Sequence, residues 1–187
     1  GLDGVLRNRT DFIKGVTNGL DICNWDPETD KAIYFNYSKS NPSAKKKNKT
    51  ELKKELGLDN AAMTDAPLFS VISRLACNKG IDIMPSAFEN ILKNGYQLII
   101  LGSGEKYYER IYTEFAQKYP GQVSVNIEFD ADKARRIFAG SDFLLMPSRY
   151  EPCGISQLIA MRYGTIPIVH RVGGLAETVI DEFKYSE

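Results

Sequence analysis

A single carboxylate in a stiffened loop is the first candidate for chemistry in this chain. Glu151 lies in the segment Tyr-Glu-Pro-Cys-Gly, where Pro152 restricts the backbone and Cys153 adds little bulk. A carboxylate there can accept hydrogen bonds from two sugar hydroxyls, or offset positive charge on a sugar during its transfer. The alternative is a surface or capping carboxylate, because acidic residues favour helix N-termini.

Possible phosphate donors follow this loop directly. Gly154, Ile155 and Ser156 open the next predicted helix. The first N–H groups of a helix have no acceptor inside it, so together with the Ser156 hydroxyl they can hold a phosphate. The simpler alternative is an ordinary helix N-cap.

Two cations follow the first predicted strand, in the segment SRLACNKG. Arg74 and Lys79 could clamp a diphosphate, Arg74 as a planar fork and Lys79 as a mobile point charge. A pair of solvated loop cations is the alternative, because exposed charges in loops are common.

Two glycine pairs indicate loops that something approaches closely. Gly102 and Gly104 follow the second predicted strand, but Tyr107 stands where a dinucleotide fingerprint needs its third glycine. Gly173 and Gly174 lie between the fifth predicted strand and a helix, where a ligand could come near the backbone. Plain turns are the alternative for both pairs.

One aromatic ring lies where a nucleobase could stack. Phe129 comes just after the third predicted strand, although core packing is the commoner fate of phenylalanine. His170 ends the fifth predicted strand and is interpreted as a strand-end residue rather than a ligand.

An α/β sheet is needed to bring these residues to one edge. Apolar runs predict strands at 68–72, 97–101, 123–127, 143–146 and 166–170. Helical patterns lie between them, at 84–92, 105–118, 131–139 and 154–163, with a short helix from 174. Strands that alternate with helices and are apolar on both faces predict a Rossmann-like, parallel, doubly wound sheet.

The first third of the chain has a different texture. Residues 1–66 are polar, and we treat them as a unit separate from residues 67–187. The lysine run within 38–54 is interpreted as a solvated loop that feeds a short helix at 49–56. After residue 187 such a sheet normally adds a further strand, so we expect the C-terminus to be truncated.

Composition excludes several classes of function. Twenty-four basic residues balance twenty-four acidic ones, so no overall field favours nucleic acid or a membrane. Three widely spaced cysteines argue against a disulfide framework. A single histidine excludes a histidine-rich metal site and a Ser-His-Asp triad within this chain. No apolar run is long enough to span a membrane, and no signal peptide is visible.

Taken together and in order, these segments resemble bacterial glycogen synthases and plant starch synthases. The resemblance spans the chain, in GLDGVLRNR, GVTNGLDICNWDPETD, SRLACNKG, PSRYEPCGISQL and YGTIPIVHRVGGLAETV. The NGLD segment with its following W-P-TD, and EPCG followed by Q, are specific to this family rather than to nucleotide-binding sheets in general.

The resemblance implies the C-terminal lobe of a GT-B glycosyltransferase, preceded in residues 1–66 by the end of the N-terminal lobe and an interdomain segment. It implies transfer of glucose from ADP-glucose to the non-reducing end of an α-1,4-glucan with retention, without a metal or cofactor. The implied partners are ADP-glucose or ADP and a glucan bound mainly by the other lobe, with no nucleic acid or membrane. The implied location is the cytoplasm of a bacterium, or the plastid of a photosynthetic eukaryote. The isolated chain is expected to be inactive.

The resemblance also implies a role for several of the candidate residues, position by position. Arg74 and Lys79 would hold the donor diphosphate, Glu151 would engage the donor glucose, and Phe129 occupies a base-stacking position. The full donor-binding set comprises Gly102, Gly104, Phe129, Cys153, Gly154, Ile155, Ser156, Gly173 and Gly174.

Two departures and three alternatives remain. Ile159 stands where many retaining GT-B enzymes carry a second glutamate, which favours glycogen and starch synthases over the broader group. Cys77 and Asn78 precede Lys79, where relatives often carry Gln. The alternatives are a retaining GT-B enzyme with another donor, a non-catalytic nucleotide- or glucan-binding module, and a dinucleotide-dependent oxidoreductase.

Overall fold

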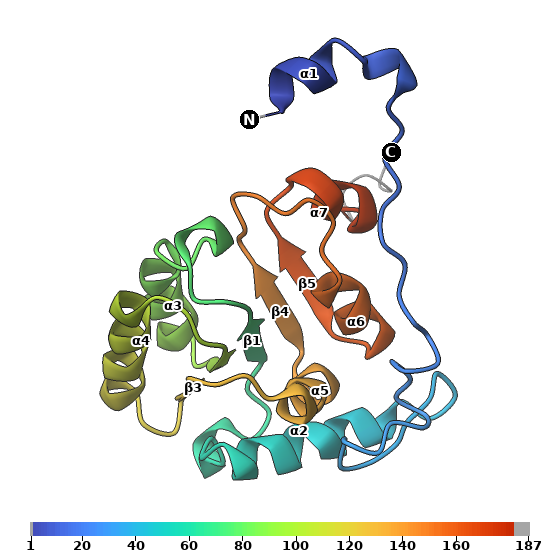
Figure 1. The fold of residues 1–187 in the computed structure, drawn as a ribbon. Helices are drawn as coiled ribbons and strands as arrows, with labels where there is room; N and C mark the ends of the chain where they lie inside the picture. The colour runs from blue at the N-terminus through green and yellow to red at the C-terminus, as the bar shows by residue number, and fades with distance from the viewer. Residues whose placement is uncertain (1, 182–187) are drawn as a thin grey trace.

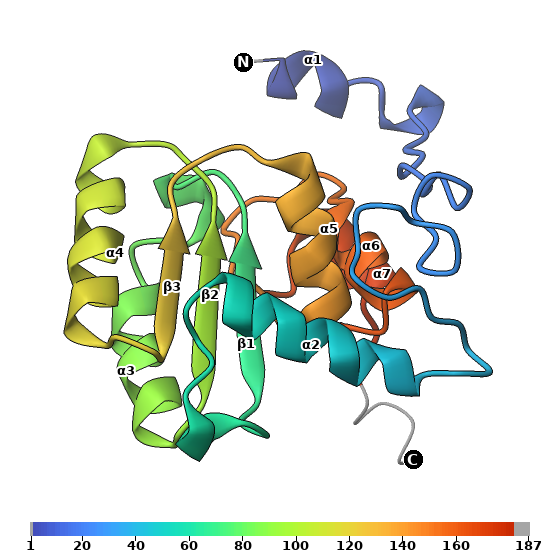
Figure 2. The same cartoon turned by 90° about the horizontal axis from the view of Figure 1, so that it is seen from below.

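A five-stranded parallel sheet organises the chain in the computed structural model, which describes residues 2–181 (Figures 1 and 2). The strands are β1 (Leu68–Ile72), β2 (Gln97–Leu101), β3 (Val123–Asn126), β4 (Phe143–Met146) and β5 (Ile166–Val169). Their order across the sheet is β3-β2-β1-β4-β5. This confirms the predicted Rossmann-like, doubly wound arrangement.

Helices cover both faces of the sheet. The helices of the described chain are α1 (Asp3–Arg7), which lies away from the sheet, α2 (Ser43–Glu55), α3 (Met84–Lys93), α4 (Lys106–Lys118), α5 (Ala131–Gly140), α6 (Ser156–Arg162) and α7 (Gly173–Thr178). Short 3-10 turns form at Thr10–Phe12, Ala61–Met63 and Cys77–Lys79. Helices α3 and α4 lie on one face, and α2 and α5 on the other (Figure 2).

Burial on both faces explains why the strands read as continuous apolar runs. All five residues of β2 are buried, and the side chains of β1 and β2 contribute to cores on opposite sides of the sheet. Phe88 of α3 and Tyr112 of α4 pack in one core, whereas Ile137 of α5 and Leu52 of α2 pack in the other. Parallel sheets are stable only when both faces are covered in this way.

The strand order reverses between β1 and β4. The chain leaves β1 for a helix on one face and leaves β4 for α6 on the other, so the loops after these strands diverge. In open α/β sheets, ligands bind at such a topological switch point, beyond the carboxyl ends of the strands.

The lysine run was wrongly predicted as a loop. Helix α2 begins at Ser43 rather than near Lys49, and it includes the run. Lys45, Lys49 and Lys53 recur every fourth residue and share one face of the helix. That face packs on the body of the protein, because lysine stems can be buried while their ammonium groups find polar partners.

Each inward lysine has a defined acceptor. The Lys45 ammonium donates to the carbonyls of Phe138 and Ala139 at the end of α5, and burial lowers the pKa of Lys45 to about 7. Lys49 pairs with Asp142 at 2.6 Å. Helix α2, which precedes position 67, therefore packs against the sheet domain through these lysines.

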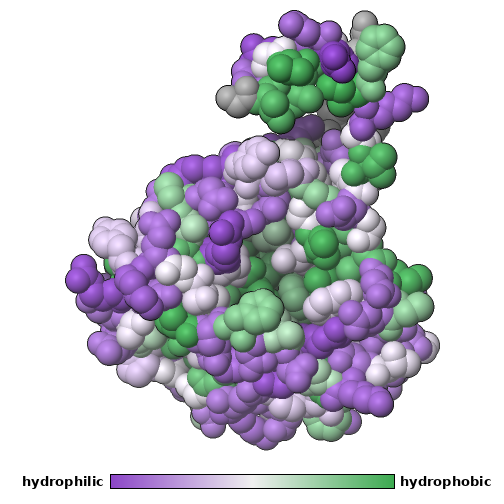
Figure 3. Space-filling model, in the orientation of Figure 1, coloured by the Kyte–Doolittle hydropathy of each residue, from purple (hydrophilic) through white to green (hydrophobic). Residues whose placement is uncertain are grey.

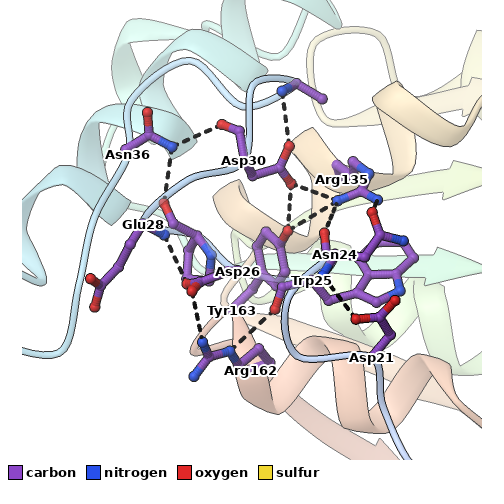
Figure 4. A network of polar contacts seen from close by, with 12 residues as sticks. Asp21, Asn24, Trp25, Asp26, Glu28, Asp30, Asn36, Arg135, Arg162 and Tyr163 are labelled. Atoms are coloured by element: carbon purple, nitrogen blue, oxygen red, sulfur yellow. Dashed lines mark hydrogen bonds and ion pairs between the residues drawn. The ribbon is translucent and has the colours of Figure 1, made fainter.

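A polar network fixes the segment before α2 to helices α5 and α6 (Figure 4). Arg135 of α5 lies 4.0 Å above the Trp25 ring and donates to Asp30 at 3.0 Å. Tyr163, just after α6, donates its hydroxyl to the same carboxylate. Arg162 donates to the Trp25 carbonyl at 3.2 Å. Because Asp30 is buried, these partners replace the water that its carboxylate loses on folding.

The N-terminal piece stands apart from the sheet domain (Figure 1). Helix α1 carries no buried residue, and the exposed apolar side chains of this piece include Leu2, Val5, Leu6 and Phe12. These side chains gather on one lobe of the surface (Figure 3). None of the helices in residues 2–181 has the length and apolar character needed to cross a membrane.

Replacing Arg135 by Ala should reduce the free energy of unfolding by roughly 3–5 kcal/mol, because it leaves the buried Asp30 carboxylate without its cation. Arg136→Ala is the matched control. Arg136, the next residue of α5, forms a similar pair with Glu55 of α2, but this pair lies nearer to solvent, so its loss should cost about 1 kcal/mol or less. Denaturant unfolding measures both. Equal losses in the two variants would contradict the assignment of the network as a buried charge cluster.

Candidate functional site

A pocket of about 240 Å³ lies at the switch point between β1 and β4. It is lined by Val71, Ile72, Ser73, Arg74, Lys79, Leu145, Met146, Pro147, Ser148, Glu151, Gly154, Ile155 and Ser156. Six of the predicted site residues therefore come together: Arg74, Lys79, Glu151, Gly154, Ile155 and Ser156. The pocket does not include the other six: Gly102, Gly104, Phe129, Cys153, Gly173 and Gly174.

An ion pair crosses this pocket. The Lys79 ammonium lies 2.5 Å from a carboxylate oxygen of Glu151, and both side chains are largely buried. Ser148, which is also buried, donates its hydroxyl to the same oxygen at 3.2 Å. Glu151 is therefore neither a surface carboxylate nor a helix cap, and its charge is held inside the pocket.

Arg74 lines the same pocket as Lys79 but has no paired carboxylate among the residues that the structure describes. Its side chain is exposed at the pocket, just after β1. The pocket thus offers one unpaired cation beside a paired lysine and carboxylate. This arrangement suits a ligand that brings an anionic group to Arg74 and a neutral or cationic group to Glu151.

Backbone donors complete the pocket. Gly154 has a φ of +74°, a left-handed conformation that favours glycine, and it turns the chain into α6. The helix begins at Ser156, two residues later than the prediction of a start near Gly154. Gly154, Ile155 and Ser156, at the start of α6, line the same pocket as the cations, and the first N–H groups of a helix have no acceptor inside it.

The loops after β1 and β4 pack against each other through their backbones. Gly80 has a φ of +70°, and a Cβ atom there would lie 2.1 Å from the Pro147 carbonyl oxygen. Arg149 donates from its backbone to Asn78 and from its side chain to Cys77. These contacts hold Lys79 opposite Glu151.

The first glycine pair packs against the loop that follows β1. A Cβ atom at Gly102 would lie 1.8 Å from the Ser73 carbonyl oxygen, and one at Gly104 would lie 2.2 Å from that of Leu75. The Gly104 N–H donates to Glu109 at 2.9 Å. Close approach is therefore real at both glycines, but the approaching group is the backbone that carries Arg74. Direct contact of these glycines with a donor stays a prediction.

The second glycine pair supports the loop of Glu151. A Cβ atom at Gly173 would lie 2.2 Å from the Glu151 carbonyl oxygen, and one at Gly174 would lie 2.3 Å from that of Cys153. The Gly174 N–H donates to the backbone carbonyl of Glu151 at 3.1 Å. The Cys153 sulfur accepts a hydrogen bond from the Asn18 backbone at 3.1 Å, which ties the N-terminal segment to this loop.

Phe129 is not a core residue. Its ring is 93% exposed, at the carboxyl edge of the sheet beyond β3. Asp130 caps α5 as predicted, by accepting a hydrogen bond from the Lys133 backbone at 2.8 Å. Burial therefore does not explain the ring, and stacking on a base stays a prediction. His170 directly follows β5, and its Nδ1 lies 2.9 Å from the Ser148 carbonyl oxygen, in agreement with a residue at the end of a strand.

Sequence reasoning missed three residues that shape the site: Ser148, Arg149 and Gln157. Gln157 is fully buried and donates to the carbonyls of Cys153 and Gly154 at 3.1 Å each. It lies in the EPCG-to-Q spacing that the sequence analysis singled out without giving it a role. No group of three or more potential metal ligands occurs within residues 2–181.

Solved structures share this fold. The catalytic domain of starch synthase IV from Arabidopsis thaliana, bound to ADP and acarbose, matches with a TM-score of 0.91 and 34% identity, over 97% of this chain and 37% of that one. The Anabaena protein HepE in complex with UDP and glucose matches with a TM-score of 0.66 and 22% identity, over 92% of this chain and 42% of that one, which shows the fold alone. The fold and pocket therefore define a Rossmann-like lobe of a GT-B glycosyltransferase.

The chain belongs to the group 1 glycosyl transferases, whose family model matches residues 50–185. It is 48% identical over 179 residues to the glycogen synthase of Kosmotoga olearia, and 47% identical over 182 residues to that of Geotalea uraniireducens. These matches cover 96% and 97% of this chain but 37% of each relative. The chain thus spans about a third of the length of the curated relatives that it matches.

Replacing Gly174 by Ala should displace the Cys153 carbonyl and with it the loop of Glu151, because the added methyl group meets backbone rather than a flexible side chain. We expect a loss of roughly 1–3 kcal/mol in the free energy of unfolding. Gly15→Ala is the control, since nothing lies within 4 Å of a Cβ atom there. Thermal unfolding of the two variants measures the difference, and an unchanged midpoint for Gly174→Ala would show that the loop yields freely.

Proposed function

We propose that this chain forms the donor side of a glycogen or starch synthase, which transfers glucose from ADP-glucose to the non-reducing end of an α-1,4-glucan with retention. The pairing of Lys79 with Glu151 beside the unpaired Arg74 carries the proposal. A nucleotide-sugar donor has the complementary chemistry, because an anionic diphosphate is joined directly to the sugar carbon that becomes positive during transfer. The similarity to glycogen synthases and to starch synthase IV supports this choice among sugar-nucleotide enzymes.

The two cations act on the leaving group. Negative charge grows on the diphosphate as its bond to the sugar breaks, so Arg74 and Lys79 stabilise the transition state more than the bound donor. Arg74 has no internal carboxylate partner among the described residues and is available to the diphosphate. Lys79 exchanges part of its contact with Glu151 for the incoming phosphate oxygens. With two cations and the α6 donors in place, the proposed reaction uses no metal and no cofactor.

Glu151 acts on the sugar. Its carboxylate accepts hydrogen bonds from the glucose hydroxyls and offsets positive charge as the oxocarbenium-like state develops. Ser148 and Lys79 hold one of its oxygens, which fixes the carboxylate before the donor arrives. Phe129, exposed beyond β3, stacks on the adenine. The acceptor glucan binds mainly to the part of the protein outside this chain.

A donor panel tests the proposal. The full-length protein is given ADP-glucose, UDP-glucose or UDP-N-acetylglucosamine with a glucan, and chain elongation is measured. We expect the highest kcat/KM with ADP-glucose and an α-configured product by NMR. Faster transfer from another donor would replace the assignment by another retaining GT-B enzyme. Nucleotide binding without transfer from any donor would favour a binding module, and binding of NAD alone an oxidoreductase.

Glu151→Gln should separate charge from hydrogen bonding. The amide keeps the size of the side chain but removes its negative charge, so kcat of the full-length enzyme should fall by roughly 10²–10³-fold, the scale of one lost electrostatic contact. ADP affinity should stay near that of the wild type, because other groups hold the nucleotide. Glu55→Gln, which alters an ion pair between α2 and α5 outside the pocket, is the control.

Steady-state kinetics and ADP titration measure the two effects. If Glu151→Gln keeps much of the activity and Glu151→Ala loses it, hydroxyl anchoring rather than charge is the role of Glu151. Near-normal kcat in both variants would remove Glu151 from the reaction.

A further inference from the structure

Arg149 joins the two loops that carry the proposed catalytic groups. It lies two residues before Glu151, in the loop after β4, yet its polar contacts are to the loop after β1. Its backbone N–H donates to the Asn78 carbonyl at 3.0 Å, and its Nη1 donates to the Cys77 carbonyl at 2.8 Å. These are the two residues immediately before Lys79.

The same side chain also holds the chain beyond Lys79. Both terminal nitrogens of Arg149 contact the Asp82 carboxylate, with Nη2 and Oδ2 2.7 Å apart and Nη1 bonded to Oδ1. This hydrogen-bonded pairing lowers the pKa of the Asp82 carboxyl, so the carboxylate stays ionised into more acidic solution. One planar guanidinium thus forms hydrogen bonds to the loop both before and after Lys79.

The contribution of these contacts is geometric. Arg149 does not line the pocket, and the Arg149 and Asp82 side chains are 44% and 32% exposed, where an ion pair adds little to stability. What the contacts fix is the distance between two loops whose facing groups, Lys79 and Glu151, are 2.5 Å apart. Beside them, Gly80 lies so close to the Pro147 carbonyl that a Cβ atom would overlap it. The loop therefore has little room to restore the position of Lys79 if the contacts of Arg149 are removed.

We propose that Arg149, with Asp82, is a positioning residue that sets Lys79 against Glu151 for the transfer step. The proposal rests on the proposed function, because it acts through the groups assigned there to the diphosphate and the sugar. It differs from a catalytic role, since Arg149 touches neither the donor nor the reacting atoms. Misplacement of Lys79 by about 1 Å costs on the order of 100-fold in rate.

The test compares Arg149→Gln and Arg149→Lys with Arg136→Gln in the full-length protein. Arg136 also forms a two-contact pair, with Glu55 at 3.0 and 3.2 Å, but away from the pocket. We expect kcat to fall roughly 100-fold in Arg149→Gln, with a smaller change in KM for the donor and a melting temperature close to that of the control. Lysine should restore little, because a single ammonium cannot reproduce the fork.

A second measurement does not depend on activity. Hydrogen exchange of residues 78–83 reports the loop, where the Lys79 and Gly80 amides donate to Ala76 and Cys77. Arg149→Gln should speed exchange there, and Arg136→Gln should not. Unchanged exchange, or faster exchange with normal kcat, would overturn the proposal.

The two proposals fail separately. If the wild-type protein transfers no glucose from any donor, the proposed function fails. The effect of Arg149 on the loop is then tested by hydrogen exchange alone. A loss of protection in Arg149→Gln that is confined to residues 78–83 supports this effect, and unchanged protection overturns it. If the wild type is active, Asp82→Asn should lower kcat as Arg149→Gln does, and the double variant should lose no further activity. That result would confirm that the two residues act through their shared contact.

Discussion

The ion pair between Lys79 and Glu151 is the contact on which the site depends. Its two residues are 72 positions apart and come from loops that lead to opposite faces of the sheet. A doubly wound sheet brings such loops together only where its strand order reverses, between β1 and β4. The fold therefore fixes where the pair can form, and the pair determines which ligand chemistry the crevice suits.

Close backbone packing explains how short loops hold these charges without a large core beneath them. Gly80, Gly102 and Gly174 each lie so near a neighbouring carbonyl oxygen that a Cβ atom would overlap it. Each of these contacts joins one sheet-edge loop to another. The polar residues of the site are thus supported by main chain rather than by flexible side chains, which preorganises them for an electrostatic role.

Most of the fold could be predicted from the sequence, because the strands are buried on both faces and appear as unbroken apolar runs. The start of α2 could not, since lysines at every fourth position are typical of a solvated surface, and only the structure shows their carbonyl and carboxylate partners. The central pocket residues were predicted from loop position. The role of Arg149 was not, because it depends on contacts about 70 residues away in the chain. Gly102 and Gly104 indicated that another group comes close to the backbone, but the sequence did not show that this group is the loop after β1.

The hydrogen bond from the Asn18 backbone to the Cys153 sulfur limits how far the N-terminal piece can move. Between the N-terminal piece and the Asn18 contact with Cys153, residues 14–17 make no hydrogen bond within the described chain. A tether of that length reaches about 14 Å at full extension. Any swing of the N-terminal piece relative to the sheet is therefore limited by a short tether anchored at Cys153, in the same loop as Glu151.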